Sequence, residues 1–123
     1  MSDNYFKTGL ENLKKIDRTA GSNVIENLSD IAPDLARYII EFAFGQIYER
    51  PGLSLQEREL LTLSSLLTAG GCEAQLQVHI NAALHVGIKE DKIIEAFLHC
   101  IPYTGFPKVL NAVAVAGQIF SGK

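Results

Sequence analysis

Apolar residues recur at helical spacing along most of the chain, and no stretch alternates between apolar and polar residues as a strand would. The predicted helices cover residues 3–16, 22–29, 33–48, 54–69, 72–86, 89–101 and 107–120. Because no strand is predicted, the expected fold class is all-α. We expect a single domain over residues 1–123, built as an antiparallel helical bundle of about six helices.

Proline, glycine and capping residues mark the expected helix ends. Pro33 stands in the first turn of its helix, where proline is favoured. The segment SLQE at residues 54–57 fits a capping box, which predicts that a helix starts there. The glycine pair at 70–71 is expected to break that helix, and Gly87 to stop the next one. The segment PYTGFP at residues 102–107 is expected to be a loop.

Composition and charge restrict the classes of function. The 123 residues are 47% hydrophobic and 20% charged, as is typical of a globular protein. The formal net charge is −3 with both signs scattered along the chain, and no basic block favours a nucleic-acid partner. No apolar run reaches the roughly 18 residues of a membrane span, and no apolar signal region begins the chain. We therefore expect a cytoplasmic protein with neither a nucleic-acid nor a membrane partner.

Two of the predicted helices favour a homo-oligomer, and the two cysteines are expected to be reduced and to bind no metal. The helices predicted over residues 33–48 and 107–120 are apolar over wide arcs, which favours burial in a homo-oligomer interface. Cys72 and Cys100 are too far apart in sequence to suggest metal-ligand spacing, so no metal is expected. Both thiols are expected to be reduced.

One carboxylate interrupts a leucine stripe in the helix predicted over residues 54–69. At about 100° per residue, Glu59 lies within an arc of about 140° that is otherwise made of leucines. These leucines are Leu55, Leu60, Leu63, Leu66 and Leu67. A carboxylate inside an apolar stripe is expected to have a polar partner. The alternative is a glutamate at the edge of the stripe that reaches water or a neighbouring cation.

The helix predicted after the glycine pair carries a cysteine and a histidine on its inward face. Cys72 and His79 share this face, and Gln75 borders it. Seven residues of regular helix span about 10.5 Å, so the thiol and the imidazole are not expected to hydrogen-bond directly. Gln75 lies one turn before His79 and can reach it, and Glu59 is expected to approach either residue. The alternative interpretation is an inert core cysteine and a hydrogen-bonded core histidine.

The sequence leaves open whether Cys72 is a thiolate and which roles Arg50 and Tyr103 have. The first turn of a helix favours a thiolate at Cys72, whereas a Glu59 anion nearby opposes it. Arg50 ends a predicted helix, where it either pairs with the last carbonyls or receives an anionic ligand by a bidentate contact. Tyr103 lies in the predicted loop and either lines a pocket or packs. Cys100 shares a face with apolar residues, which favours a packing role.

Three segments in this order, RPGLS…ERELLTL, CEAQLQVHINAAL and YTGFPKVLNAV, resemble the carboxymuconolactone decarboxylase family. The resemblance covers residues 25–121 and leaves an N-terminal helix within 1–24. It implies an alkylhydroperoxidase-like fold that assembles into trimers or hexamers. It also implies decarboxylation of 4-carboxymuconolactone to the β-ketoadipate enol-lactone, a step of aromatic catabolism, without a cofactor. His79 matches the family's LxxHxxAA pattern, which implies acid–base work, and Arg50 matches the arginine before PGL, which implies binding of a substrate carboxylate.

The related alkylhydroperoxidase branch carries C-x-x-C-x-x-x-H and a glutamate on the preceding helix. Cys72, His79 and Glu59 match three of these positions, whereas Gln75 stands where the second cysteine would meet peroxide. The match leaves Cys72 as a thiol that peroxide would oxidise to a sulfenic acid. Cys100 resolves that acid only if the two sulfurs come within disulfide geometry.

Three functional interpretations follow. In the first, the protein is a lyase acting on a carboxylated lactone or a similar small acid. His79 then transfers a proton to the carbon left by CO2, and Arg50 orients the anion. Glu59, Cys72, Gln75 and Tyr103 complete this site, and no metal is involved. The second interpretation is a thiol redox protein that uses Cys72. The third is a non-enzymatic oligomeric module in which Glu59 and His79 form a structural network.

Overall fold

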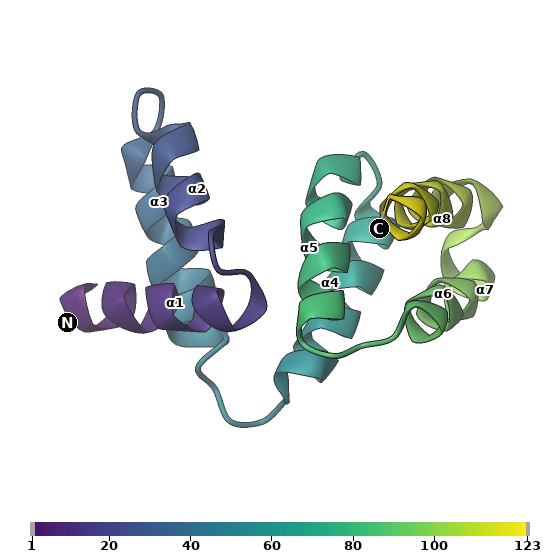
Figure 1. Ribbon diagram of the computed structural model, residues 1–123, viewed down its shortest axis with the longest axis horizontal. Coiled ribbons are helices and arrows are strands. Elements are labelled where there is room, and N and C mark those ends of the chain that lie inside the picture. The colour runs from purple at the N-terminus through teal and green to yellow at the C-terminus, as the bar shows by residue number, and fades with distance from the viewer. Residues whose placement is uncertain (1, 123) are drawn as a thin grey trace. The chain divides into compact units, whose positions relative to one another are not determined.

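The computed structural model describes residues 2–122, and all regular structure in that range is helical. The helices are α1 (Ser2–Ile16), α2 (Ala20–Leu28), α3 (Pro33–Tyr38), η1 (Ile39–Ile47), α4 (Leu55–Ala69), α5 (Glu73–His85), α6 (Glu90–His99), α7 (Ile101–Thr104) and α8 (Phe106–Ser121) (Figure 1). The all-α prediction is therefore confirmed for the described residues. The chain divides into two compact units, Met1–Ser54 and Leu55–Lys123.

The helix boundaries follow most of the predicted signals. α3 begins with Pro33, and α4 begins at Leu55, directly after the serine of the capping motif. α4 ends at Ala69, and the next residues, Gly70 and Gly71, have φ angles of 75° and 70°. Glycine adopts this left-handed conformation without the steric cost that a Cβ would bring. The turn reverses the chain, so that α4 and α5 pack against each other.

The segment after α6 is more helical than its prolines suggest. The loop predicted over residues 102–107 is wrong except at Gly105, because Ile101–Thr104 forms the single turn α7 and α8 already begins at Phe106. Pro102 stands in the first turn of this helix, where its missing N–H would have no carbonyl to bond. The Thr104 hydroxyl donates to the Cys100 carbonyl at 3.0 Å and closes the turn.

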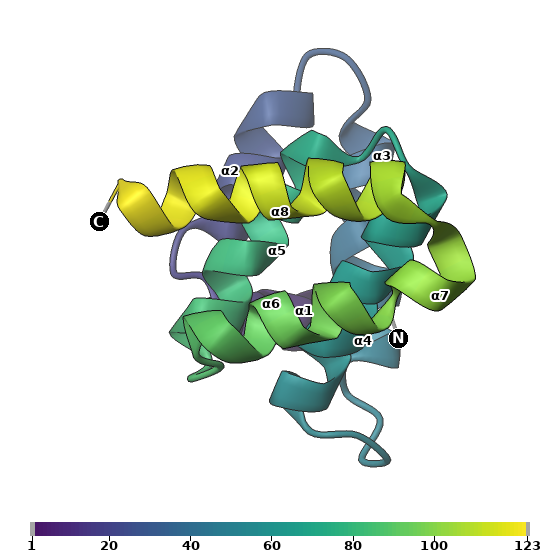
Figure 2. The ribbon, with the colours of Figure 1, turned by 90° about the vertical axis from the view of Figure 1, so that its right-hand side faces the viewer.

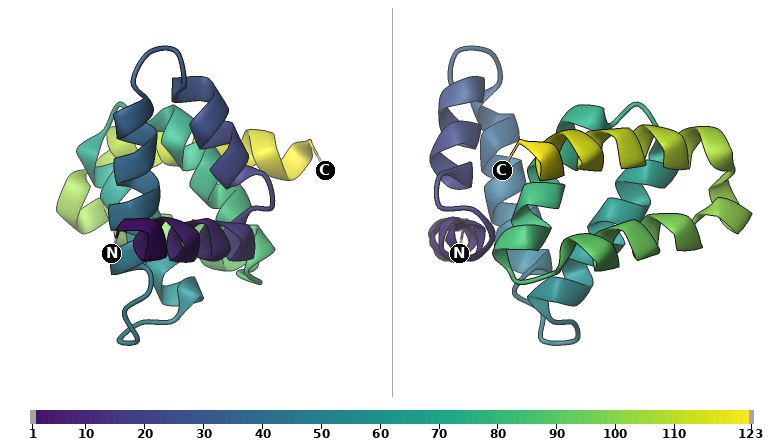
Figure 3. Two further views of the ribbon diagram at one scale, coloured as in Figure 1. Left: turned by 90° about the vertical axis from the view of Figure 1, so that its left-hand side faces the viewer. Right: turned by 45° about the vertical axis from the view of Figure 1, so that its right-hand side comes forward.

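In the first unit, α1 crosses the continuous rod formed by α3 and η1, and α2 runs beside α3 (Figure 3). The prediction of a helix over residues 33–48 is confirmed, but its second half is a π-helix and not an α-helix. The Tyr48 N–H, for example, donates to the Ala43 carbonyl five residues earlier at 2.9 Å.

Two glycines allow α1 to lie directly on η1. A Cβ added to Gly9 would overlap the carbonyl oxygen of Ile40, and a Cβ added to Gly45 would overlap that of Tyr5. The two helices therefore touch backbone to backbone. The spacing of apolar residues does not reveal a contact between two backbones. It therefore predicted a helix over residues 33–48 without showing that the second half of this helix is a π-helix.

A buried amide reinforces the same contact. Asn12 on α1 donates from Nδ2 to the Phe44 carbonyl at 2.7 Å and to Glu49 Oε1 at 3.1 Å. The amide satisfies a carbonyl near the end of η1 and holds the segment that follows it. This segment leads directly to Arg50.

The second unit consists of two helix pairs, α4 with α5 and α6 with α8, packed around one apolar core (Figure 2). The buried core residues are Leu63, Leu67, Leu76, Ile80, Ala83, Ile88, Ile93, Phe97, Cys100, Val109, Ala112 and Ala116. Cys100 belongs to this core, so its predicted packing role is confirmed. Among the described residues, no helix is both long and apolar enough to cross a membrane.

Candidate functional site

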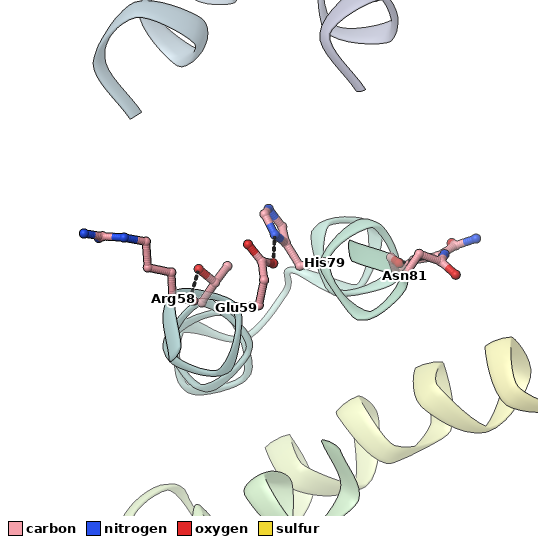
Figure 4. A network of polar contacts seen from close by, with 6 residues as sticks. Arg58, Glu59, His79 and Asn81 are labelled. Carbon is pink, nitrogen blue, oxygen red and sulfur yellow. Dashed lines mark hydrogen bonds and ion pairs between the residues drawn. The ribbon is translucent and has the colours of Figure 1, made fainter. Parts of the chain in front are cut away.

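A buried glutamate and a half-buried histidine meet between α4 and α5 (Figure 4). Glu59 Oε1 lies 2.9 Å from His79 Nδ1. The Glu59 side chain is 0% exposed and that of His79 is 18% exposed. The predicted approach of Glu59 to His79 is therefore confirmed, and the edge-of-stripe alternative, in which Glu59 reaches water, is wrong.

The apolar pattern of both helices explains why these polar side chains lie inside. Leu63 follows Glu59 by one turn of α4 and is fully buried, so turning the carboxylate outward would expose the leucine as well. On α5, Leu76 precedes His79 and Ala83 follows it on the same face, and both are buried. Packing of the leucine and alanine side chains thus brings the carboxylate and the imidazole together.

Neighbouring polar residues point away from the pair. In Figure 4, Arg58 and Asn81 extend from opposite sides of the two helices, away from the carboxylate and the imidazole. Asn81 donates from Nδ2 to the Gln77 carbonyl at 3.0 Å, on the exposed face of α5. His85 on the same face is exposed as well.

The hydrogen bond determines which imidazole nitrogen remains available. An ionised carboxylate can only accept hydrogen bonds, so Nδ1 of His79 donates to Glu59. Nε2 is then the nitrogen that can exchange a proton with another molecule. The pair is therefore suited to hold a proton at Nε2 and release it.

Cys72 lies at the N-terminal end of α5, whereas His79 lies in the middle of this helix. Cys72 is the N-cap residue of the helix, it is half-buried, and its thiol donates to the Gly70 carbonyl with an Sγ–O distance of 3.4 Å. Because α5 is unbroken from Glu73 onward, about 10.5 Å of helix rise separates Cys72 from His79. As expected, the two do not form a direct pair.

The remaining predicted residues lie at exposed positions. Gln75 is exposed, one turn before His79 on α5. Tyr103 on α7 is 79% exposed, and its ring centroid lies 5.8 Å from that of His99. Arg50 is exposed in the first unit, where it lines a pocket of about 330 Å³, and its N–H donates to the Ile47 carbonyl at 3.1 Å.

Two polar contacts escaped the sequence analysis, namely those of Asn12 and of Lys108. Lys108 on α8 donates from Nζ to the Thr68 carbonyl at 2.8 Å and thereby caps the end of α4. These residues lie 32 and 40 positions from the carbonyls they bond, so no local motif marks them. Within residues 2–122, no three His, Cys, Asp or Glu side chains gather as they would around a metal ion.

Comparisons with known proteins agree on one family. The model of the carboxymuconolactone decarboxylase family matches residues 33–118. The chain is 34% identical over 116 residues to 4-carboxymuconolactone decarboxylase of Acinetobacter baylyi, covering 94% of this chain and 86% of that protein. It is also 34% identical over 109 residues to nitrosuccinic acid decarboxylase of Metarhizium robertsii, covering 85% of this chain and 76% of that protein.

Proposed function

The chain belongs to the carboxymuconolactone decarboxylase family, and on this premise we propose that it is a carboxy-lyase acting on a small carboxylated lactone or a similar acid without a cofactor. The observation that carries the proposal is the 2.9 Å hydrogen bond between Glu59 and His79. It leaves Nε2 of a half-buried imidazole as the proton donor. 4-Carboxymuconolactone is the first candidate substrate.

The proposed reaction needs a place for the electron pair that CO2 leaves behind. When the bond between carbon and carboxylate breaks, the pair moves into an electron-withdrawing group of the substrate itself. The imidazolium of His79 then donates its Nε2 proton to a carbon of the delocalised carbanion, and water returns a proton to Nε2. In the nitro acid this is the carbon that lost CO2. In the lactone it is the ring carbon beside the carbonyl, because the double bond shifts onto the carbon that lost CO2. One CO2 leaves and one proton is taken up, so no oxidant or reductant is required.

The substrates named for the two relatives support a common chemical class. 4-Carboxymuconolactone has a lactone carbonyl and nitrosuccinic acid has a nitro group, and both groups accept an electron pair. We infer that the substrate of this chain is a small acid whose departing carboxylate leaves behind a carbanion conjugated with such a group. The proton-delivering pair then serves either substrate, because it acts on the carbon and not on the acceptor group.

Other residues take supporting roles in the proposal. Glu59 is a positioning residue, because it orients the imidazole through Nδ1. Arg50 is proposed to hold a substrate carboxylate by a bidentate contact. Gln75 and Tyr103 are proposed to contact substrate, and Cys72 to shape the pocket, as part of a homo-oligomeric enzyme.

The thiol redox interpretation has less support. Cys100 is buried in the apolar core of the second unit, and the Cys72 thiol donates to a backbone carbonyl of the preceding turn. Neither observation points to a resolving partner for an oxidised Cys72. We therefore favour proton transfer by His79 over thiol chemistry.

An assay of CO2 release from 4-carboxymuconolactone and nitrosuccinate tests the proposal. We expect the wild-type protein to decarboxylate at least one of these acids. The His79→Gln variant should lose about 100-fold or more in kcat, because general acid catalysis contributes that much. His85→Gln, on the exposed face of the same helix, is the matched control and should keep wild-type turnover. If the protein turns over neither acid above background, the proposal is wrong.

A further inference from the structure

We propose that the Glu59–His79 pair also catalyses the exchange of a product hydrogen with water, a reaction in which no CO2 is lost. The exchanging hydrogen is the one that is delivered after CO2 has left: it lies beside the nitro group in the product of the nitro acid and beside the lactone carbonyl in the enol-lactone. The inference rests on the proposed function, because the product must occupy the site in which it was formed. It adds an activity that can be measured without any decarboxylation step.

The pair holds its proton reversibly. Glu59 accepts the Nδ1–H at 2.9 Å whether His79 is neutral or charged, so only Nε2 changes state. The imidazolium that donates a proton to carbon becomes a neutral imidazole facing the new C–H bond. A neutral Nε2 is a base, and the same path run backwards removes that proton again.

The two side chains of the pair differ in their access to solvent. The Glu59 side chain is 0% exposed, so bulk water does not contact the carboxylate. His79 is 18% exposed, which gives its ring access to solvent. A proton taken from the product can therefore be replaced by one from water while the product stays bound.

The exchange balances without a further reactant. The C–H bond breaks, its electron pair moves into the nitro or lactone group, and the proton moves to Nε2. In D2O the Nε2 proton is replaced by a deuteron, which is then delivered to the carbon as the electron pair returns. A C–D bond has replaced a C–H bond, and nothing is oxidised or reduced.

The test uses 3-nitropropionate, the product of removing the nitro-bearing carbon's carboxylate from nitrosuccinate. The full chain is incubated with it in D2O, and proton NMR follows the signal of the CH2 group beside the nitro group. We expect exchange about 100-fold faster than in buffer alone, in line with general acid–base catalysis. His79→Gln should lower the catalysed rate by about 100-fold as well, whereas the His85→Gln control should not.

Decarboxylation of nitrosuccinate and of 4-carboxymuconolactone is measured on the same protein sample. If only the lactone is turned over, its enol-lactone product replaces 3-nitropropionate as the exchange probe. Circular dichroism checks that each variant is folded.

Each result separates the two proposals. Decarboxylation with exchange that depends on His79 supports the inference. Decarboxylation without exchange overturns the inference and leaves the proposed function intact, and so does exchange that is equally fast in His79→Gln. Loss of both activities in the wild-type protein overturns the proposed function and the inference together.

Discussion

Each unit contains a buried polar side chain, but the two are used differently. Asn12 in the first unit is 4% exposed and bonds the carbonyl of Phe44, a group that cannot gain or lose a proton in water. Glu59 in the second unit is 0% exposed and bonds the imidazole of His79, which can. Burial alone therefore does not identify a functional residue. The feature that does is a buried titratable side chain whose titratable partner reaches solvent.

The two units also differ in how their helices are held together. In the first unit, Gly9 and Gly45 let two backbones touch, and the Asn12 amide bonds across the contact. In the second unit, helix pairs share a core of aliphatic side chains and Phe97. Substitutions at this helix contact of the first unit should therefore act on stability, whereas a change at Glu59 should act on chemistry.

The largest expected effect is on catalysis by Glu59→Gln. The substitution keeps the shape of the side chain but removes the carboxylate that accepts the Nδ1–H of His79, so kcat should fall about 100-fold with little change in KM. Nitrogen-15 NMR of the imidazole should show that Nδ1 no longer donates to a carboxylate. Glu95→Gln on the exposed side of α6 is the control. Wild-type kcat in Glu59→Gln would mean that the pair is only structural.

The next largest effect is expected at the glycine contact. Gly45→Ala should lower the free energy of unfolding by about 1–3 kcal/mol, because its methyl group overlaps a backbone carbonyl that cannot move aside. Gly117→Ala on α8 should have the opposite sign. Among the described residues, no heavy atom lies within 4 Å of its added Cβ, so the gain in helix propensity of about 0.5–1 kcal/mol remains. Urea denaturation measures both, and equal signs would contradict the close approach.

A smaller effect is expected from removing the buried amide. Asn12→Ala should cost about 1–2 kcal/mol of unfolding free energy, since the Phe44 carbonyl would lose its hydrogen bond inside the protein. Asn81→Ala removes an amide from an exposed bond to Gln77 and should stay within about 0.5 kcal/mol of the wild type. A similar loss in both variants, in the same urea titration, would erase the distinction between a buried and an exposed amide.

The smallest effect is expected at Lys108. Lys108→Met should destabilise the second unit by about 0.3–1 kcal/mol, because the Thr68 carbonyl at the end of α4 would lose a cationic donor. Lys7→Met, at an exposed position of α1, is the comparison. A shift in thermal midpoint that is the same in both variants would show that the cap contributes nothing.

Sequence patterns predicted most of the helix boundaries and the contact between Glu59 and His79. The leucine stripe indicated that Glu59 faces inward, and the faces of α5 indicated the same for His79, so their meeting was predictable. The single turn α7 was not predictable, because Pro102 is compatible with either a loop or a first helical turn. The bonds of Asn12 and Lys108 were not predictable either, since each joins positions that only the tertiary fold brings together.

The π-helix Ile39–Ile47 has a consequence for insertions and deletions in this rod. Each residue of an ordinary helix turns the chain by about 100°, and a π-helix accommodates extra residues by widening its turns. Deleting one residue from Ile39–Ile47 would restore the narrower winding while leaving the rod continuous. Glu49 would then rotate away from the Asn12 amide, and Arg50 would emerge on another side of the rod. The number of residues in Ile39–Ile47 thus sets the direction in which the Arg50 guanidinium points.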